Sequence, residues 1–305
     1  MVCAFFIHLE QDTHILKRQK KSLLKLDAME ILFLPKALNL KDSLDIQVYD
    51  YNTAKEATKQ KVNLTQNVIS FLIEGRKEVF SDSRSINIQN SSFLIIRKGH
   101  CLMTERLSAP HNNYRSILLF FSDDAIINFM RKYNILNRKN VLSKAVTPFE
   151  YDDFTNAIAN SLMSISNLNT VTQKKLLQVK FEELMLYLTD IKGTQFVLSL
   201  FFGNDNFSGR FLSIVENNKL KKMSLNELAF LSSMSLSTFK RAFSKHFKES
   251  PSKWFLDQRL EHSAYLLKHK NHRPSDIFED VGFNTLSNFI QAFKSKYGVT
   301  PKQYK

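Results

Sequence analysis

Two stretches near the end of the chain are similar to each other: MSLSTFKRAFSKHFKESP at Met234–Pro251 and FNTLSNFIQAFKSKYGVTP at Phe283–Pro301. A shift of 50 residues superimposes Phe239 on Phe289, Ala242 on Ala292, Phe243 on Phe293 and Pro251 on Pro301. Upstream of these pairs the shift is 49, which aligns Leu228 with Ile277 and Met234 with Phe283. A change of one residue at a turn is what two copies of one helix–turn–helix unit would show.

Each copy predicts the same local structure. A short helix, at Leu225–Ser232 and again at Ser275–Val281, leads into a turn marked by Ser233 or Gly282. A second helix follows, and the small polar residues at its start are natural N-caps. Its aromatic residues are spaced i, i+4, i+8, so we expect them to form one buried stripe. A proline ends each unit because proline disrupts a helix interior.

The segment between the copies predicts a long helix from Pro251, at the first helical position, to about Lys270. Its apolar residues are expected to contact both units: Trp254, Phe255, Leu260, Ala264, Leu266 and Leu267. At 1.5 Å per residue this helix spans roughly 25–30 Å, close to the ~34 Å of one DNA turn. Two units on a rigid spacer favour double-stranded DNA over RNA, whose major groove is too narrow.

Positive charge is concentrated in the same part of the chain. The sequence has 43 Lys and Arg against 29 Asp and Glu, a net charge of +14. From Phe207 onward there are 17 basic and 8 acidic residues, and the rest of the chain holds 26 and 21. Excess positive charge indicates an anionic partner rather than a fold. Its position indicates that the last third binds that partner.

Composition excludes several classes of protein. The 305 residues are 43% hydrophobic and 24% charged, which is ordinary for a soluble protein of two domains. The seven glycines lie at least six residues apart, which excludes the glycine loops that bind dinucleotides and phosphates. Cys3 and Cys101 make neither a disulfide framework nor a four-ligand zinc site. We expect no cofactor, no metal, no enzymatic activity and no membrane span, since the apolar runs are too short.

Residues 29–192 predict a first domain, with strands followed by helices. Runs rich in β-branched and aromatic residues lie at Ile31–Leu34, Ile46–Tyr51, Val68–Ile73, Ser92–Ile96 and Ile117–Phe121. Several strands without intervening helices favour a sandwich or small barrel. Residues 193–206 predict an interdomain linker, and residues 207–305 predict the helical second domain. Residues 1–28 are interpreted either as a disordered arm or as a segment upstream of a start at Met29.

Leu177, Phe181, Leu184 and Leu188 alternate at spacings of 4 and 3. Two heptads of this kind permit a helix–helix contact between subunits. We interpret the four residues as a dimerisation seam. The alternative is that the stripe packs on its own barrel.

The last 100 residues resemble the DNA-binding domain of the AraC/XylS family of bacterial transcription regulators. The resemblance rests on Gly282-Phe283, on Phe289, Phe293 and Lys294, and on Tyr297-Gly298-Val299-Thr300-Pro301 with Tyr304. Family members commonly begin with a cupin-like β-barrel, and Phe93–His100 is similar to part of it. The resemblance implies an α+β fold: an N-terminal cupin-like β-barrel with dimerisation helices, and a C-terminal all-α domain of two helix–turn–helix units joined by a long helix.

Three residues depart from the family pattern. Phe278 stands where a small alanine is usual, so the packing between the helices of the second unit must differ. Glu249 replaces a usual glycine before Ser250-Pro251, which makes a left-handed turn there less comfortable. Gln291 replaces a common arginine, which weakens the case for strong guanine recognition by the second unit.

The resemblance implies a sequence-specific DNA-binding transcription regulator, an activator that contacts RNA polymerase and is controlled through its barrel. A small molecule bound in the barrel would shift the equilibrium between DNA-competent and incompetent states. Two alternatives stay open: a regulatory protein controls the same DNA-binding module, or the first domain is an unrecognised enzyme fused to it. We expect a homodimer in the cytoplasm.

In such a domain the outward face of each second helix enters the major groove. The residues expected to contact bases are Ser237, Thr238, Lys240 and Arg241 in the first unit, and Leu286, Ser287, Asn288 and Gln291 in the second. Arginine and lysine suit guanine, and asparagine and glutamine suit adenine. We therefore expect the second half-site to be rich in A·T pairs and more weakly recognised.

Five basic residues are expected to contact phosphates: Lys245, Lys253, Arg259, Lys294 and Lys296. For Arg259 an internal ion pair with Asp257, Glu261 or another acidic residue is an equal alternative. If some 5–6 phosphates are neutralised, the logarithm of the affinity should fall against log salt with a slope near −5.

Overall fold

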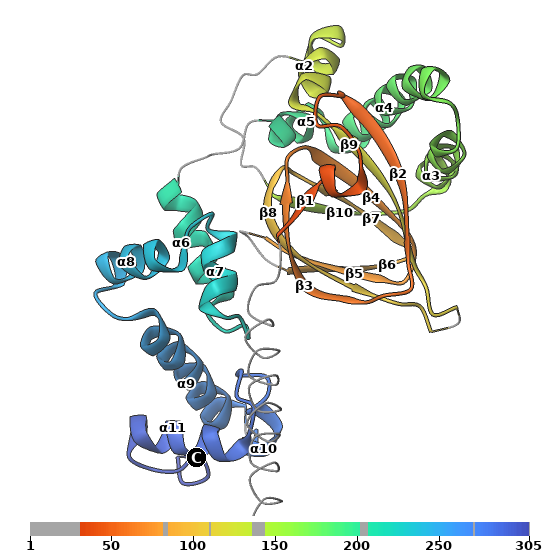
Figure 1. Ribbon diagram of the computed structural model, residues 1–305. Helices are drawn as coiled ribbons and strands as arrows, with labels where there is room; N and C mark the ends of the chain where they lie inside the picture. Colours follow the sequence, from red (N-terminus) through yellow and green to blue (C-terminus); the bar gives the residue numbers. More distant parts are fainter. Residues whose placement is uncertain are drawn as a thin grey trace, which may run out of the picture.

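A computed structural model describes residues 31–81, 85–109, 111–135, 144–201, 207–270 and 272–304. Strands dominate the first half, and the C-terminal part is helical (Figure 1). The expected α+β class is confirmed. The segment 1–28 lies outside the described residues. In the described part, no helix is both long and apolar enough to cross a membrane.

The described strands form two five-stranded sheets, not one continuous ring. Sheet 1 has the order β1-β3-β8-β5-β6, with bounds Leu32–Leu34, Ala57–Leu64, Gly99–Arg106, Arg76–Phe80 and Ser85–Gln89. Sheet 2 has the order β10-β7-β4-β9-β2, with bounds Val146–Glu150, Ser92–Ile96, Asn67–Glu74, Tyr114–Phe121 and Ile46–Thr53. Only the β1–β3 pair is parallel among the described pairs. The described strands of the first domain thus form two sheets, and a cupin-like barrel stays a prediction.

The central strands of sheet 2, β7, β4 and β9, are buried on both faces. Along β9, Ile117, Leu119 and Phe121 belong to the core beneath the helices, whereas Leu118 and Phe120 belong to the core between the sheets. Successive side chains of a strand point to opposite faces, so a strand covered on both sides is apolar throughout.

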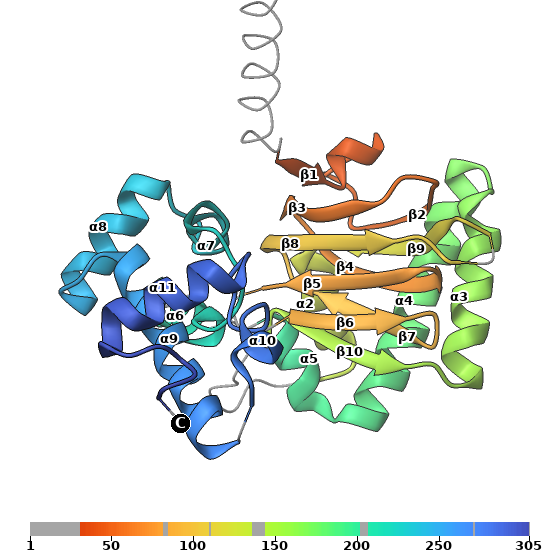
Figure 2. The same cartoon turned by 90° about the horizontal axis from the view of Figure 1, so that it is seen from below.

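Helices α2 (Asp123–Lys132), α3 (Asp153–Ser166), α4 (Thr170–Lys192) and α5 (Thr194–Phe201) follow the strands. Helices α3 and α4 lie over the outer face of sheet 2 (Figure 2). Leu177, Phe181, Leu184 and Leu188 are all buried in this helix–sheet core. The predicted seam between subunits is therefore wrong. This stripe is the face of α4 that packs on sheet 2 of the same chain.

The predicted linker 193–206 is shorter than expected. Helix α5 occupies most of it, and Val197, Leu198 and Leu200 are buried in the core of the first domain. Residues 202–206 lie outside the described residues. The apolar run around α5 belongs to the first domain because it fills the space beside α2 and α4.

The C-terminal part contains two three-helix units. The first comprises α6 (Phe207–Asn218), α7 (Leu225–Leu231) and α8 (Leu236–Phe247), and the second comprises α9 (Pro251–His269), α10 (Pro274–Ile277) and α11 (Leu286–Tyr297). Each unit has its own apolar core. The predicted second helices and the predicted long helix lie where the sequence places them.

The first unit also packs against sheet 1. Phe80 of β5 and Leu102 of β8 share a core with α6 and α7. His100 Nδ1 donates a hydrogen bond of 3.1 Å to the carbonyl of Phe230, and the two rings stack with centroids 4.6 Å apart. No pattern in the sequence indicates this interface, since it joins residues 130 apart in the chain.

Candidate nucleic-acid interface

Helix α8 begins at a side-chain cap and buries a phenylalanine stripe. The Ser235 hydroxyl accepts a hydrogen bond of 3.2 Å from the Thr238 backbone N–H, which satisfies a free donor of the first turn. Phe239 and Phe243 are fully buried. Their burial turns the opposite face, with Ser237, Lys240, Arg241 and Lys245 exposed, toward solvent.

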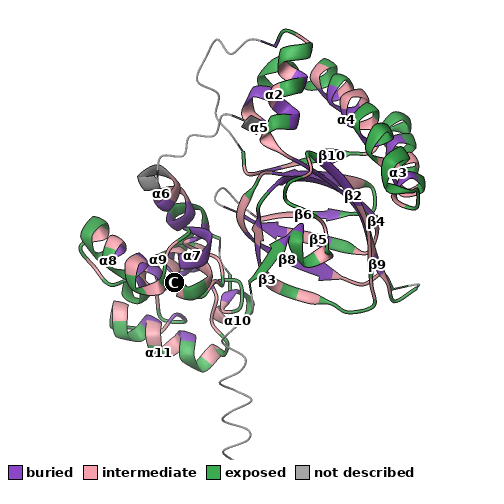
Figure 3. Cartoon of the chain, turned by 45° about the horizontal axis from the view of Figure 1, so that its top comes forward, coloured by how far each residue is buried: buried purple, intermediate pink, exposed green. Residues whose placement is uncertain are grey.

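Helix α11 repeats this arrangement. Thr285 accepts a hydrogen bond of 3.2 Å from the Asn288 N–H, and Phe289 and Phe293 are fully buried. Ser287, Asn288 and Gln291 are exposed, whereas Thr238 and Leu286 are half-buried. Leu286 packs on the core of its unit, so it offers less surface than the other predicted base-contact residues. In Figure 3 the colours along both helices alternate between exposed positions and positions that are buried or half-buried.

The short helices and turns before α8 and α11 are also equivalent. Helix α7 begins with a capping box formed by Ser224 with Glu227, and α10 begins with half of one, since the Arg273 backbone N–H donates to Oδ2 of Asp276 at 3.2 Å. The residue at the turn has a positive φ in each, +56° at Ser233 and +84° at Gly282. The predicted duplication therefore extends to the backbone conformation.

Helix α9 joins the two units. Pro251 is at its first turn, and its 19 residues give a length of roughly 28 Å. The Trp254 ring lies 5.5 Å from Phe243 and 4.8 Å from Phe247, between centroids, so the start of α9 packs on α8. Phe255 is buried in the first unit, and Leu260, Ala264 and Leu267 are buried in the second.

Three of the five predicted phosphate-contact residues lie on the surface. Lys245 and Lys294 are exposed. Lys253 is exposed too, and its Nζ lies 2.5 Å from Oε1 of Glu249. The hydrogen bond with Glu249 raises the pKa of Lys253 above its ordinary value, so its charge is kept at any physiological pH.

The other two face inward, which corrects their predicted role. Arg259 donates to the carbonyl oxygens of Phe255 and Gly282, both at 3.3 Å, and its Cζ lies 5.6 Å from the Phe283 ring centroid. Burial lowers the pKa of Arg259. Among the described residues Arg259 has no acidic partner, so the alternative of an internal ion pair is not observed there either; its partners are two carbonyl oxygens and an aromatic ring.

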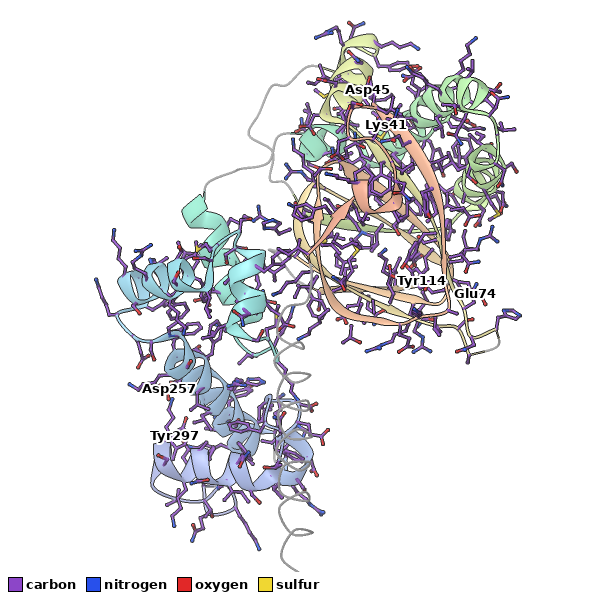
Figure 4. All side chains as sticks on the ribbon, viewed as in Figure 1. Lys41, Asp45, Glu74, Tyr114, Asp257 and Tyr297 are labelled. Carbon is purple, nitrogen blue, oxygen red and sulfur yellow. The ribbon has the colours of Figure 1, made fainter. Side chains whose placement is uncertain are left out.

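Lys296 is held between α9 and α11. Its Nζ lies 2.9 Å from Oδ1 of Asp257 and 3.1 Å from Oε1 of Glu261. Burial opposes its charge, but hydrogen bonds to the two carboxylates outweigh burial and raise its pKa. Asp257 lies opposite the Tyr297 end of α11 (Figure 4). Lys296 thus fixes the second unit on α9 and is not free for a phosphate.

Comparisons with known proteins agree with this architecture. The chain matches a model of the ExsA N-terminal regulatory domain over residues 67–200 and a helix-turn-helix domain over residues 228–305. The virulence regulon transcriptional activator VirF of Yersinia enterocolitica is 23% identical over 252 residues, covering 79% of this chain and 90% of VirF. The thermoregulatory protein LcrF of Yersinia pestis gives the same identity and coverage.

The chain belongs to the AraC/XylS family. This AraC/XylS-family protein is a DNA-binding transcription regulator with an N-terminal regulatory domain. A solved structure of ToxT from Vibrio cholerae aligns with a TM-score of 0.38 and 16% identity, covering 85% of this chain and 97% of ToxT.

Proposed function

We propose that this AraC/XylS-family regulator is a cytoplasmic activator that places α8 and α11 in two successive major-groove segments of one duplex. The observation that carries the proposal is the pairing of buried phenylalanine stripes with exposed polar faces on two helices joined by α9. VirF supports an activating role, since it is named a transcriptional activator. An activator of this kind is expected to contact RNA polymerase once it is bound.

The two units differ in the bases they suit. The exposed side chains of Lys240 and Arg241 suit guanine, whereas those of Asn288 and Gln291 suit adenine. Ser237 also lies 3.0 Å from Ser235, between their hydroxyl oxygens, so its hydroxyl is partly used in the cap. We expect stronger discrimination by the first unit, because a good bidentate pair is worth about 1–3 kcal/mol.

The proposal is tested by footprinting the full chain on duplexes selected from a random-sequence pool. We expect protection of one face over two adjacent turns. Lys240→Ala with Arg241→Ala should remove protection of one turn, and Asn288→Ala with Gln291→Ala should remove protection of the other. The control is Arg131→Ala, which removes an exposed charge from α2 in the first domain. Protection unchanged by both double variants would overturn the assignment of α8 and α11.

The first domain offers a place for a small-molecule effector. A cavity of about 940 Å³ lies between the two sheets, lined mainly by apolar side chains such as Val62, Val68 and Phe120. At its polar part, Nζ of Lys77 lies 3.3 Å from Oε1 of Glu105, and both are buried. Because Glu105 already neutralises Lys77, the cavity suits an apolar molecule with an uncharged polar group.

Native mass spectrometry of the purified full chain tests this proposal. A retained small molecule that Leu118→Trp displaces would support it, since Leu118 lines the cavity. A chain with an empty cavity that co-purifies with a stoichiometric protein would favour control by a regulatory protein. The fused-enzyme alternative is the weakest, because residues 67–200 match a regulatory domain.

We also propose a homodimer, formed by the outer face of α4 in place of the buried one. Val171, Val179 and Leu186 are exposed on that face. In an antiparallel pair with Val179 at the two-fold axis, Lys175 of one copy lies opposite Glu183 of the other. Sedimentation of Val179→Glu tests this: the variant should be monomeric at concentrations where the parent chain is dimeric.

A further inference from the structure

The internal repeat extends upstream of the helix–turn–helix units. With the shift of 49 residues, four buried residues of α6 superimpose on four buried residues of α9: Phe211 on Leu260, Ile214 on Ser263, Val215 on Ala264 and Asn218 on Leu267. Helix α6 is therefore to the first unit what α9 is to the second. The same shift superimposes Arg210 on Arg259, and Ser233 on Gly282.

In the second unit, Arg259 connects the supporting helix to the turn before α11. It donates to the Gly282 carbonyl at 3.3 Å, and its guanidinium lies over Phe283. A Cβ on Gly282 would lie 2.8 Å from Nη1, so turn and arginine are in close contact. This contact holds the turn before α11, the recognition helix of the second unit, against α9.

In the first unit the equivalent arginine lies against the regulatory domain. Arg210 Nη2 is 3.7 Å from where a Cβ on Gly99 of β8 would be. Its charge, after burial, contributes to lowering the pKa of the neighbouring His100. Its Nε is buried without a hydrogen-bond partner among the described residues. An unpaired buried donor is costly, so this position is not the best one available to Arg210.

The turn that Arg210 would contact is already formed. Ser233 and Met234 donate backbone hydrogen bonds to Phe230 and Ala229, both at 2.9 Å. In the second unit Gly282 and Phe283 make the same two bonds, at 2.9 Å, to the residues shifted by 49.

We propose that Arg210 is a positioning residue for α8, the recognition helix of the first unit. Docking of β8 on this unit prevents Arg210 from contacting the turn at Ser233. When the regulatory domain leaves the first unit, Arg210 turns to the Ser233 carbonyl, as Arg259 does at Gly282. The domain interface thereby controls the first half-site while the second unit stays assembled. This inference rests on the proposed binding of two half-sites.

The test is a double-mutant cycle in the full chain. His100→Ala removes the hydrogen bond to Phe230 and the ring contact, which weakens docking. On the selected duplex with only the first half-site intact, we expect His100→Ala to raise affinity at least about 5-fold. Arg210→Lys keeps the charge but not the planar donor pair, so it should cancel that gain.

The matched control is Arg259→Lys. It should weaken binding to the second half-site to the same extent with His100 or with Ala at position 100. A gain from His100→Ala that persists with Arg210→Lys would overturn the proposal, and so would the absence of any gain.

Hydrogen exchange without DNA separates this inference from the proposed function. In His100→Ala the amides of Ser233 and Met234 should exchange more slowly, and Arg210→Lys should remove this protection. Such coupling without a two-part footprint would retain the role of Arg210 and reject the two half-sites. A two-part footprint without the coupling would retain the two half-sites and reject the role of Arg210.

Discussion

At the scale of single residues, the two recognition helices α8 and α11 differ in the residue that follows each C-terminus, which is a lysine after α8 and a glycine after α11. Lys248, after α8, has φ +59°, and Gly298, after α11, has φ +75°. The left-handed residue is thus Lys248, one position before the Glu249 that the sequence suggested. Glu249 instead pairs with Lys253.

Lys248→Gly should therefore stabilise the chain. A left-handed non-glycine residue costs roughly 1–2 kcal/mol, part of which glycine loses again as entropy, so we expect a gain of about 0.5 kcal/mol. Urea unfolding measures it. The mirror variant Gly298→Ala should lose about 1 kcal/mol, and a gain there would contradict the argument.

Gly282→Ala should be costlier than a backbone effect alone. The added Cβ would lie 2.8 Å from Nη1 of Arg259, in addition to the strain of φ +84°. Gly298→Ala is the matched control, since Gly298 has φ +75° in the left-handed region and nothing within 4 Å among the described residues. We expect Gly282→Ala to lose about 1 kcal/mol more than the control in urea unfolding. Equal losses of unfolding free energy would show that the Arg259 side chain moves away from the added Cβ at no cost.

His100 should make the chain less stable in acid. Burial first, and the charge of Arg210 second, lower the pKa of folded His100 below its ordinary 6.5. The folded state then binds fewer protons, so the contribution is complete above about 6.5 and is lost as pH falls through the folded value. Between pH 7.5 and pH 5, the parent chain should lose more unfolding free energy than His100→Gln. An identical loss in both would exclude His100 as the cause.

At the scale of elements, the sequence predicted the apolar sheet and missed most of the polar one. The predicted strands are β1 of sheet 1 and β2, β4, β7 and β9 of sheet 2, whose central strands are buried on both faces. Strands β3, β5 and β6 escaped notice because they carry exposed polar residues such as Thr58, Arg76 and Asn87. Periodicity reports burial, so it is weak where half of a strand is solvated.

The recognition helices were predictable because the duplication doubles each signal. Their exposed residues, Arg241 and Gln291 among them, follow directly from the phenylalanine spacing. Arg259 and Lys296 were wrongly predicted to contact phosphates. Spacing indicates on which face of a helix a residue lies but not which neighbouring helix covers that face. The seam of α4 was misplaced for the same reason.

Two leucines of α4 distinguish its packing on the core from its proposed role in the dimer. Leu184 is fully buried, and Leu186, two residues later, is 41% exposed. Leu184→Ala should cost about 2–5 kcal/mol of unfolding free energy. Leu186→Ala should leave unfolding nearly unchanged and weaken self-association in sedimentation. A dimer lost with Leu184→Ala at full stability would restore the buried stripe as the seam.

At the scale of the molecule, the inward positions of Arg259 and Lys296 reduce the expected salt dependence. Lys245, Lys253 and Lys294 remain for phosphates. At about −0.9 per contact, the logarithm of the affinity should fall against log salt with a slope near −3 per subunit, not −5. Fluorescence anisotropy on one duplex at several salt concentrations measures it. A slope of −5 would mean that both internal cations leave their partners on DNA.

Trp254 makes DNA binding by this protein measurable by its own fluorescence. It is the chain's single tryptophan, and it touches Phe243 and Phe247 of α8. Trp254 belongs to α9, but its ring packs against the core of the first unit, whereas Tyr297 and Tyr304 pack against the core of the second. Indole emission is therefore a built-in optical probe of one half of the DNA-binding domain. Stopped-flow mixing with DNA can time the engagement of that half separately, with no dye attached.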